Sequence, residues 1–149
     1  MIPLAKRATP AAIAVLRQAT ALRPKRKKAS DGLLPSKAHF KQSPNSDHNS
    51  GHAVDLTHDP VNGIDCFDIY ERIKADPRVK YLIFHGKIWS STNGETRYEG
   101  INEHNKHLHI SIKKGCENDT SPWFPWLGDI KKIAKVKAAV RPLPKKEKK

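Results

Sequence analysis

Residues 46–55 read Ser-Asp-His-Asn-Ser-Gly-His-Ala-Val-Asp, and residues 103–112 read Glu-His-Asn-Lys-His-Leu-His-Ile-Ser-Ile. The second segment ends in alternating apolar and polar residues, a pattern typical of a half-buried strand. Side chains two positions apart on a strand point to the same face, so His107 and His109 should project together. The two segments hold five of the eight histidines in this 149-residue chain. We interpret them as two halves of one metal site.

A second strand is expected over residues 52–57, directly after the first of these segments. Gly51 would allow the backbone to turn sharply before it. Asp55 and Ala53 are two positions apart and should share the face of the site. Val54 should point the other way, toward the hydrophobic core. The expected strand therefore presents a carboxylate on one side and apolar residues on the other.

Periodicity and turn signals predict the rest of the fold. The expected elements are helices over 10–22, 63–75 and 130–140, strands over 81–84, 88–90 and 96–98, and an irregular segment over 30–49. Thr9 is the expected N-cap of the first helix, with Pro10 in its first turn. Cys66 falls on the apolar stripe of the second helix, which indicates a core thiol. These elements predict an α+β fold with a small, mainly antiparallel sheet, helices on one face and the metal in a cleft on the other.

The two histidine segments resemble a known family, the zinc peptidases of bacterial cell walls. These are D-alanyl-D-alanine carboxypeptidases and L-alanyl-D-glutamate endopeptidases, including many phage endolysins, and hedgehog signalling domains share their fold. The pattern that carries the resemblance is Ser46-x-His48-x-x-Gly51-x-Ala53-x-Asp55 followed by His107-x-His109. A His-x-His pair alone is not specific for this family. The same is true of a histidine followed seven positions later by an aspartate, but the two patterns together are specific.

The resemblance implies a zinc site with named ligands. The family's ligands fall on His48, Asp55 and His109, and its assisting histidine falls on His107. A glutamate placed as in hedgehog domains falls on Glu103. Two histidines and one aspartate leave the fourth position of a tetrahedral zinc ion to water. Either Glu103 or His107 is then the expected general base, and the sequence leaves the choice between them open.

The implied activity is zinc-dependent hydrolysis of peptide bonds in the peptidoglycan stem peptide, as in a phage endolysin. The apolar run over residues 11–16 is too short for a signal core or a membrane span. The expected route is therefore synthesis in the cytoplasm without a signal peptide, followed by action on the cell wall after release. We expect a monomer.

Charge divides the chain into three parts. The formal net charge is +13, and eight Lys or Arg residues precede the first acidic residue, Asp31. Nine more lie from Asp129 onward, with two acidic residues, so the middle is nearly neutral. We therefore divide the chain into a basic N-terminal helix and linker (1–29), a zinc peptidase core (30–128), and a short helix with a basic tail (129–149). Basic ends can bind an anionic wall polymer, nucleic acid or an anionic membrane.

The cysteines and tryptophans are interpreted structurally. Cys66 and Cys116 form no framework, and two reduced thiols are expected. Trp123 and Trp126 could line a substrate cleft, but a cap over the core is favoured. The histidines outside the metal motif that are interpreted as hydrogen-bonded or surface residues are His52, His58, His85 and His104.

Two other function classes compete with the peptidase. The charged ends and the His/Asn-rich segments suggest a metal-dependent nuclease or nucleic-acid-binding protein. A ββα nuclease places its His and Asn on a hairpin and a helix, whereas here the last histidine pair lies in a strand-like pattern with no helix directly after it. The nuclease, and nucleic-acid binding through the basic ends, are therefore possible but not favoured. The other alternative is a non-catalytic relative that retains the fold and the zinc for binding.

Overall fold

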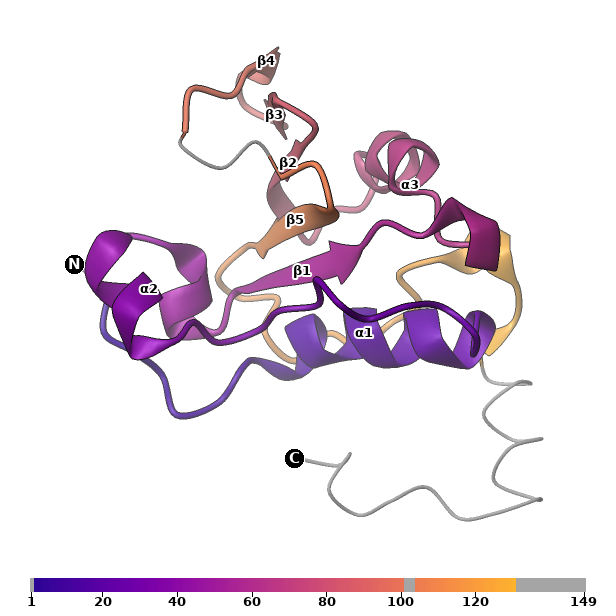
Figure 1. The fold of residues 1–149 in the computed structure, drawn as a ribbon, viewed down its shortest axis with the longest axis horizontal. Coiled ribbons are helices and arrows are strands. Elements are labelled where there is room, and N and C mark those ends of the chain that lie inside the picture. The colour runs from indigo at the N-terminus through magenta and orange to yellow at the C-terminus, as the bar shows by residue number, and fades with distance from the viewer. Residues whose placement is uncertain (1, 101–103, 131–149) are drawn as a thin grey trace.

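The computed structural model describes residues 2–100 and 104–130, which form an α+β fold around a five-stranded antiparallel sheet (Figure 1). The strands lie in the order β1-β5-β2-β3-β4. Their bounds are β1 (Ala53–Thr57), β2 (Val79–Phe84), β3 (Lys87–Ser90), β4 (Gly94–Arg97) and β5 (His107–Ile112). The predicted α+β class and the mainly antiparallel sheet are confirmed.

Within residues 2–100 and 104–130, three α-helices and three short 3₁₀ helices accompany the sheet. They are α1 (Pro10–Leu22), α2 (Lys37–Gln42), η1 (Asp47–Ser50), η2 (Pro60–Asn62), α3 (Cys66–Ile73) and η3 (Pro125–Leu127). In Figure 1, α1 runs alongside β1, and α3 lies near β2 and β5. The helix expected over 130–140 lies outside the described residues, apart from Ile130.

The sheet has an apolar face and a polar face, because successive strand residues point in opposite directions. The apolar face packs into one core with α1 and α3, and its strand residues are Val54, Leu56, Val79, Leu82, Phe84, Leu108, Ile110 and Ile112. The alternate positions of β1 and β5 are Asp55 and His109, which are directly opposed in the antiparallel register. The predicted division of β1 is therefore confirmed.

Helix α1 forms where its local signals place it. The side chain of Thr9 caps it by accepting from the backbone N–H of Ala12, and Pro10 occupies the first turn. Its buried face is largely alanine and packs against β1. Small side chains let the helix lie close to the sheet, so α1 belongs to the same core as the strands.

Helix α3 carries the other apolar stripe. Asp65 caps it by accepting from the N–H of Phe67. Its buried residues are Cys66, Ile69, Tyr70 and Ile73, as the periodicity predicted. Burial raises the pKa of the Cys66 thiol to about 12. Cys66 is a core thiol, and both it and Cys116 are free.

Several boundaries differ from the sequence expectations: α3 is shorter than the expected 63–75, and β2 begins at Val79, two residues before the expected strand over 81–84. The segment 30–49, expected to be irregular, contains α2 and η1, whose first turns are capped by the hydroxyls of Ser36 and Ser46. Strand β4 begins at Gly94, before the expected strand over 96–98, because Gly94 already pairs with Ser90 of β3. Short capped turns depend on single side-chain hydrogen bonds, and hairpin registers depend on the pairing of two strands. The periodicity of apolar residues in the sequence indicates neither.

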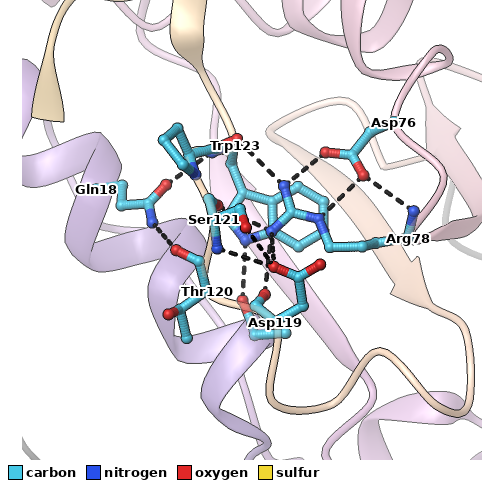
Figure 2. Close-up of polar contacts among 9 residues, drawn as sticks. Gln18, Asp76, Arg78, Asp119, Thr120, Ser121 and Trp123 are labelled. Carbon is cyan, nitrogen blue, oxygen red and sulfur yellow. Dashed lines mark hydrogen bonds and ion pairs between the residues drawn. The ribbon is translucent and has the colours of Figure 1, made fainter.

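A buried arginine fastens the loop after β5 to the rest of the molecule (Figure 2). Arg78 forms an ion pair with Asp76 at 2.6 Å and donates to the carbonyl oxygens of Asp119, Ser121 and Pro122. Its guanidinium carbon lies 3.6 Å from the ring centroid of Trp123. Trp123 is 1% exposed, which confirms the core-cap interpretation for this tryptophan.

Helix α1 also holds this loop. The side-chain amide of Gln18 donates to the carbonyl of Thr120 and accepts from the N–H of Trp123. Figure 2 shows Gln18 reaching the loop from the opposite side to Arg78.

Within the described residues, no helix is both long enough and apolar enough to cross a membrane.

Candidate metal centre

Three side chains from three different elements converge on the polar face of the sheet. His48 comes from η1, Asp55 from β1 and His109 from β5. Oδ1 of Asp55 lies 3.2 Å from Nε2 of His48 and 3.3 Å from Nδ1 of His109. The three candidate ligand atoms lie within 4.8 Å of one another. The structure thus brings together the three residues that the sequence motif singled out.

The chain before β1 is shaped to deliver His48. The hydroxyl of Ser46 accepts from the N–H of His48 and begins the turn of η1. Gly51 ends that turn with a φ of 77°, in the left-handed region that favours glycine. A β-carbon there would lie 2.7 Å from the carbonyl oxygen of Arg7. Gly51 is therefore required both by conformation and by space.

One hydrogen bond fixes the tautomer of His48. Nδ1 of His48 lies 2.6 Å from the carbonyl oxygen of Leu33, an atom that can only accept. Nδ1 must therefore carry the proton, and in the neutral ring Nε2 presents its lone pair to Asp55. Orientation of this kind, by a carbonyl behind the ring, is common for metal-binding histidines.

His109 is held by a hydroxyl group and an aromatic ring. Its Nε2 lies 2.8 Å from the hydroxyl of Ser111. The ring of Tyr81 stacks on that of His109, with centroids 5.4 Å apart. Burial and Asp47 together raise the pKa of Tyr81 to about 12, so its hydroxyl stays protonated. Nε2 of His109 is thereby occupied, and Nδ1 is the atom directed at Asp55.

The three converging atoms fit a divalent cation. Nδ1 of His109 is buried and has no hydrogen-bond partner among the described residues. When both rings are neutral, Nε2 of His48 and Nδ1 of His109 would turn two nitrogen lone pairs toward a carboxylate oxygen. Such an arrangement is unfavourable unless a cation lies between the three atoms. Two imidazoles and one carboxylate are a ligand set typical of catalytic zinc.

The electrostatics keep this site ready for a cation. Burial alone would raise the pKa of Asp55, but hydrogen bonds and charge from His109 and His48 hold it far below its ordinary value. Burial lowers the pKa of His48, yet Asp55 and the Leu33 carbonyl outweigh it and raise that pKa overall. Burial dominates at His109 and lowers its pKa. Asp55 is therefore the permanent negative charge of the site.

Two further histidines stand beside the ligands. His107 projects from β5 on the same face as His109, with its Nε2 3.7 Å from Oδ1 of Asp55. His104 packs against both, with ring centroids 5.0 Å from His107 and 5.5 Å from His109. The candidate ligand atoms of Asp55, His104 and His107 also lie within 4.8 Å of one another. Glu103, the other expected catalytic residue, lies outside the described residues.

His104 is the site residue that the sequence interpretation missed. It precedes β5, so the alternation of side chains that predicted a shared face for His107 and His109 does not apply to it. Its backbone adopts a φ of 58°, and its carbonyl accepts from the N–H of His85. This turn, unusual for a residue other than glycine, folds the ring back toward His107. The only available signal was its position inside the second histidine segment.

The other histidines have structural partners. Nε2 of His52 lies 3.0 Å from Glu117, and Nδ1 of His58 accepts from the N–H of Cys66 at the start of α3. His85 packs edge-on against Phe67. Their interpretation as hydrogen-bonded or surface histidines is confirmed, since His52 and His58 are hydrogen-bonded and His85 is exposed.

Comparisons with protein-family models, with curated proteins and with solved structures found no match. The motif and the geometry of the site are therefore the features that bear on function. That geometry defines a possible metal-binding group of His48, Asp55 and His109, with His104 and His107 beside it.

Proposed function

We propose that this protein is a zinc-dependent peptidase that hydrolyses peptide bonds of bacterial peptidoglycan, in the manner of a phage endolysin. The observation that carries the proposal is the convergence of His48, Asp55 and His109 on one point, with His107 alongside. The order and spacing of these residues also resemble those of the wall peptidases. The finer fold assignment, a hedgehog/DD-peptidase-like domain with zinc in a cleft on the polar face, belongs to the same proposal.

His48, Asp55 and His109 would hold the ion, the two histidines through Nε2 and Nδ1 and the aspartate through its carboxylate. When bound, zinc lowers the pKa of a water to about 7 and polarises a carbonyl group. The Leu33 carbonyl and the Ser111 hydroxyl hold the two imidazole rings in the required orientation. Tyr81 covers one face of the His109 ring and limits the access of bulk water to it.

The proton-transfer step falls to the residues beside the ligands. His107 is close enough to Asp55 to reach a substrate held at the ion, and it shares the strand face of His109. A histidine there can accept a proton from the attacking water and deliver it to the leaving amine. His104 packs edge-on against His107 and positions its ring. Glu103 is the alternative general base proposed from the motif.

The remaining parts of the proposal concern partners and location. The substrate is the stem peptide of peptidoglycan, and the basic ends of the chain bind anionic wall polymers. The protein acts as a monomer on the wall, after release from the cytoplasm in which it is made. No observation on the described residues favours a nuclease: the segment after β5 is a loop, without the following helix of ββα nucleases.

The decisive experiment combines metal analysis with product analysis. We would measure the zinc content of purified protein and the mass of fragments released from purified peptidoglycan. The native chain should bind stoichiometric zinc and release new free amines, and His109→Ala should lose both. His39→Ala is the matched control, because His39 is exposed in α2 and should leave both unchanged.

Each outcome separates one alternative. Zinc binding without hydrolysis of several wall types would replace the peptidase with a non-catalytic metal-binding protein. Failure to bind zinc, with no hydrolysis after its addition, would refute the proposal altogether. Cleavage of nucleic acid by the native chain and not by His109→Ala would establish the nuclease instead.

A further inference from the structure

A hollow lined by both apolar and charged residues lies next to the metal centre. It is a pocket of about 630 Å³ at the end of the sheet where β5 finishes and β2 begins. The ionisable groups that line it are Asp47, His52, Lys80, Lys113 and Lys114. We call it the lysine pocket. Nothing in the proposed metal chemistry uses it.

The pocket has an excess of positive charge. Lys80 forms an ion pair with Asp47 at 3.0 Å, which neutralises one of its three lysines. His52 is paired with Glu117 at 3.0 Å. The side chains of Lys113 and Lys114 have no ion-pair partner in the part of the chain that the structure describes. Two ammonium groups are thus free to bind an anion.

The lysine pocket is physically connected to the metal centre by two routes. Asp47 lines the pocket and directly precedes the candidate ligand His48 in η1. The charge of Asp47 acts on Tyr81, whose ring stacks on that of the candidate ligand His109. A ligand that rearranges the Asp47–Lys80 pair would therefore affect both the turn that carries His48 and the ring of Tyr81 that packs on His109.

The spacing suits one extended peptide. Lys113 follows the last residue of β5 and lies four positions after His109. Four residues of strand span about 13 Å, which is also the length of about four residues of an extended substrate. A peptide cleaved at the metal could therefore reach the pocket with a group a few residues from the scissile bond.

We propose that the lysine pocket is a carboxylate-binding subsite, in which Lys113 and Lys114 hold a free carboxylate of the peptide substrate. This inference rests on the proposed peptidase function, because it assigns the class of substrate to the same site. Stem peptides of peptidoglycan carry free carboxylates on their acidic residues and at their ends. The Lys80–Asp47 pair forms the pocket wall and keeps Lys80 oriented.

The test compares two synthetic stem peptides that differ only in a free or an amidated carboxylate. Binding to zinc-free protein would be measured by isothermal titration calorimetry, and hydrolysis by zinc-loaded protein would be measured separately. The native chain should bind the free acid about tenfold more tightly than the amide, as expected for an electrostatic contact. Lys113→Ala/Lys114→Ala should lose this preference, and its KM for the free acid should rise with little change in kcat.

The matched control is Lys25→Ala/Lys28→Ala, which removes the same charge from exposed positions away from the pocket. It should retain the tenfold preference. If the pocket variant also retains it, or if native protein binds both peptides equally, the subsite is refuted. A preference that persists in binding while no peptide is hydrolysed would support the subsite and refute the peptidase, so the two failures are distinguishable.

Discussion

Oδ2 of Asp55 lies 3.1 Å from the position that a β-carbon would occupy on Gly32. The two residues also exchange backbone hydrogen bonds, with Gly32 N–H donating to Asp55 and Asp55 N–H donating to Gly32. Gly32 is thus a short addition to the edge of the sheet that lies directly behind the carboxylate. The absence of a side chain at residue 32 leaves the carboxylate of Asp55 free to face the two histidines.

Replacing Gly32 by valine should weaken zinc binding more than it weakens the fold. The added side chain would displace the Asp55 carboxylate, and losses of about 10–100-fold in metal affinity are typical when groups that orient ligands are disturbed. The measurement is a zinc titration against a chelator, with circular dichroism to verify folding. Ala38→Val, at an exposed position of α2, is the control. Unchanged affinity in Gly32→Val would contradict this role.

His107→Ala should separate catalysis from metal binding. If His107 transfers protons, kcat should fall by about 10²–10⁴-fold while zinc content remains stoichiometric. His104→Ala should cause a smaller fall in kcat, because His104 acts by packing against the His107 ring. Both are measured by turnover on wall fragments together with zinc analysis. Loss of zinc in His107→Ala would make it a ligand and not a catalytic residue.

Arg78→Met should destabilise the protein by about 3 kcal/mol, because it leaves a partly buried carboxylate and three carbonyl groups without their partner. Asp76 and the loop carbonyls lose their donors, and Trp123 loses the guanidinium on its ring. Urea unfolding measures the effect, and zinc content should not change. Arg72→Met removes an exposed pair with Asp68 and should cost less than about 1 kcal/mol. Equal effects of the two substitutions would argue against the anchoring role of Arg78.

The two thiols should differ in reactivity with a thiol reagent at pH 8. Cys66 is buried and its pKa is raised to about 12, whereas Cys116 is partly exposed. Cys116 should react rapidly and Cys66 only after unfolding, and Cys116→Ser should abolish the fast phase. Two fast phases in folded protein would contradict the burial of Cys66.

The same shift gives a pH dependence for stability. A thiol whose pKa is raised by folding favours the neutral form in the folded state. Its contribution is present below the unfolded value of 9.0 and is lost as the pH rises from there toward about 12. Urea unfolding of native and Cys66→Ala protein over this range should show a steeper alkaline loss for the native chain.

Elements with a strong local signal could be predicted from the sequence. The alternation of residues 107–112 and the apolar stripes of α1 and α3 specify both the element and its buried face. The motif also placed His48 and Asp55 correctly relative to His109, because strand alternation and the Gly51 turn are local properties.

Features that depend on long-range pairing could not be predicted. Two such features are the contact between Gly32 and Asp55 and the anchoring of the loop by Arg78. Each joins segments that are distant in the sequence, and neither segment carries a local pattern that indicates the contact. His104 enters the site through an unusual backbone turn, which no periodicity reports. Helix α2 spans six residues in a segment rich in turn-forming residues, and its cap by Ser36 is a weak signal when read alone.

The alternation of apolar and polar residues in β5 also restricts which insertions and deletions the protein can tolerate. Deleting one residue from the strand would invert it, exchanging His109 with Ile110, so that an imidazole would enter the core and an isoleucine would occupy the metal site. Folding and chemistry would be lost in the same event. Insertions and deletions should therefore be tolerated only outside the strand, such as at the β3–β4 hairpin, where all four residues of β4 are exposed.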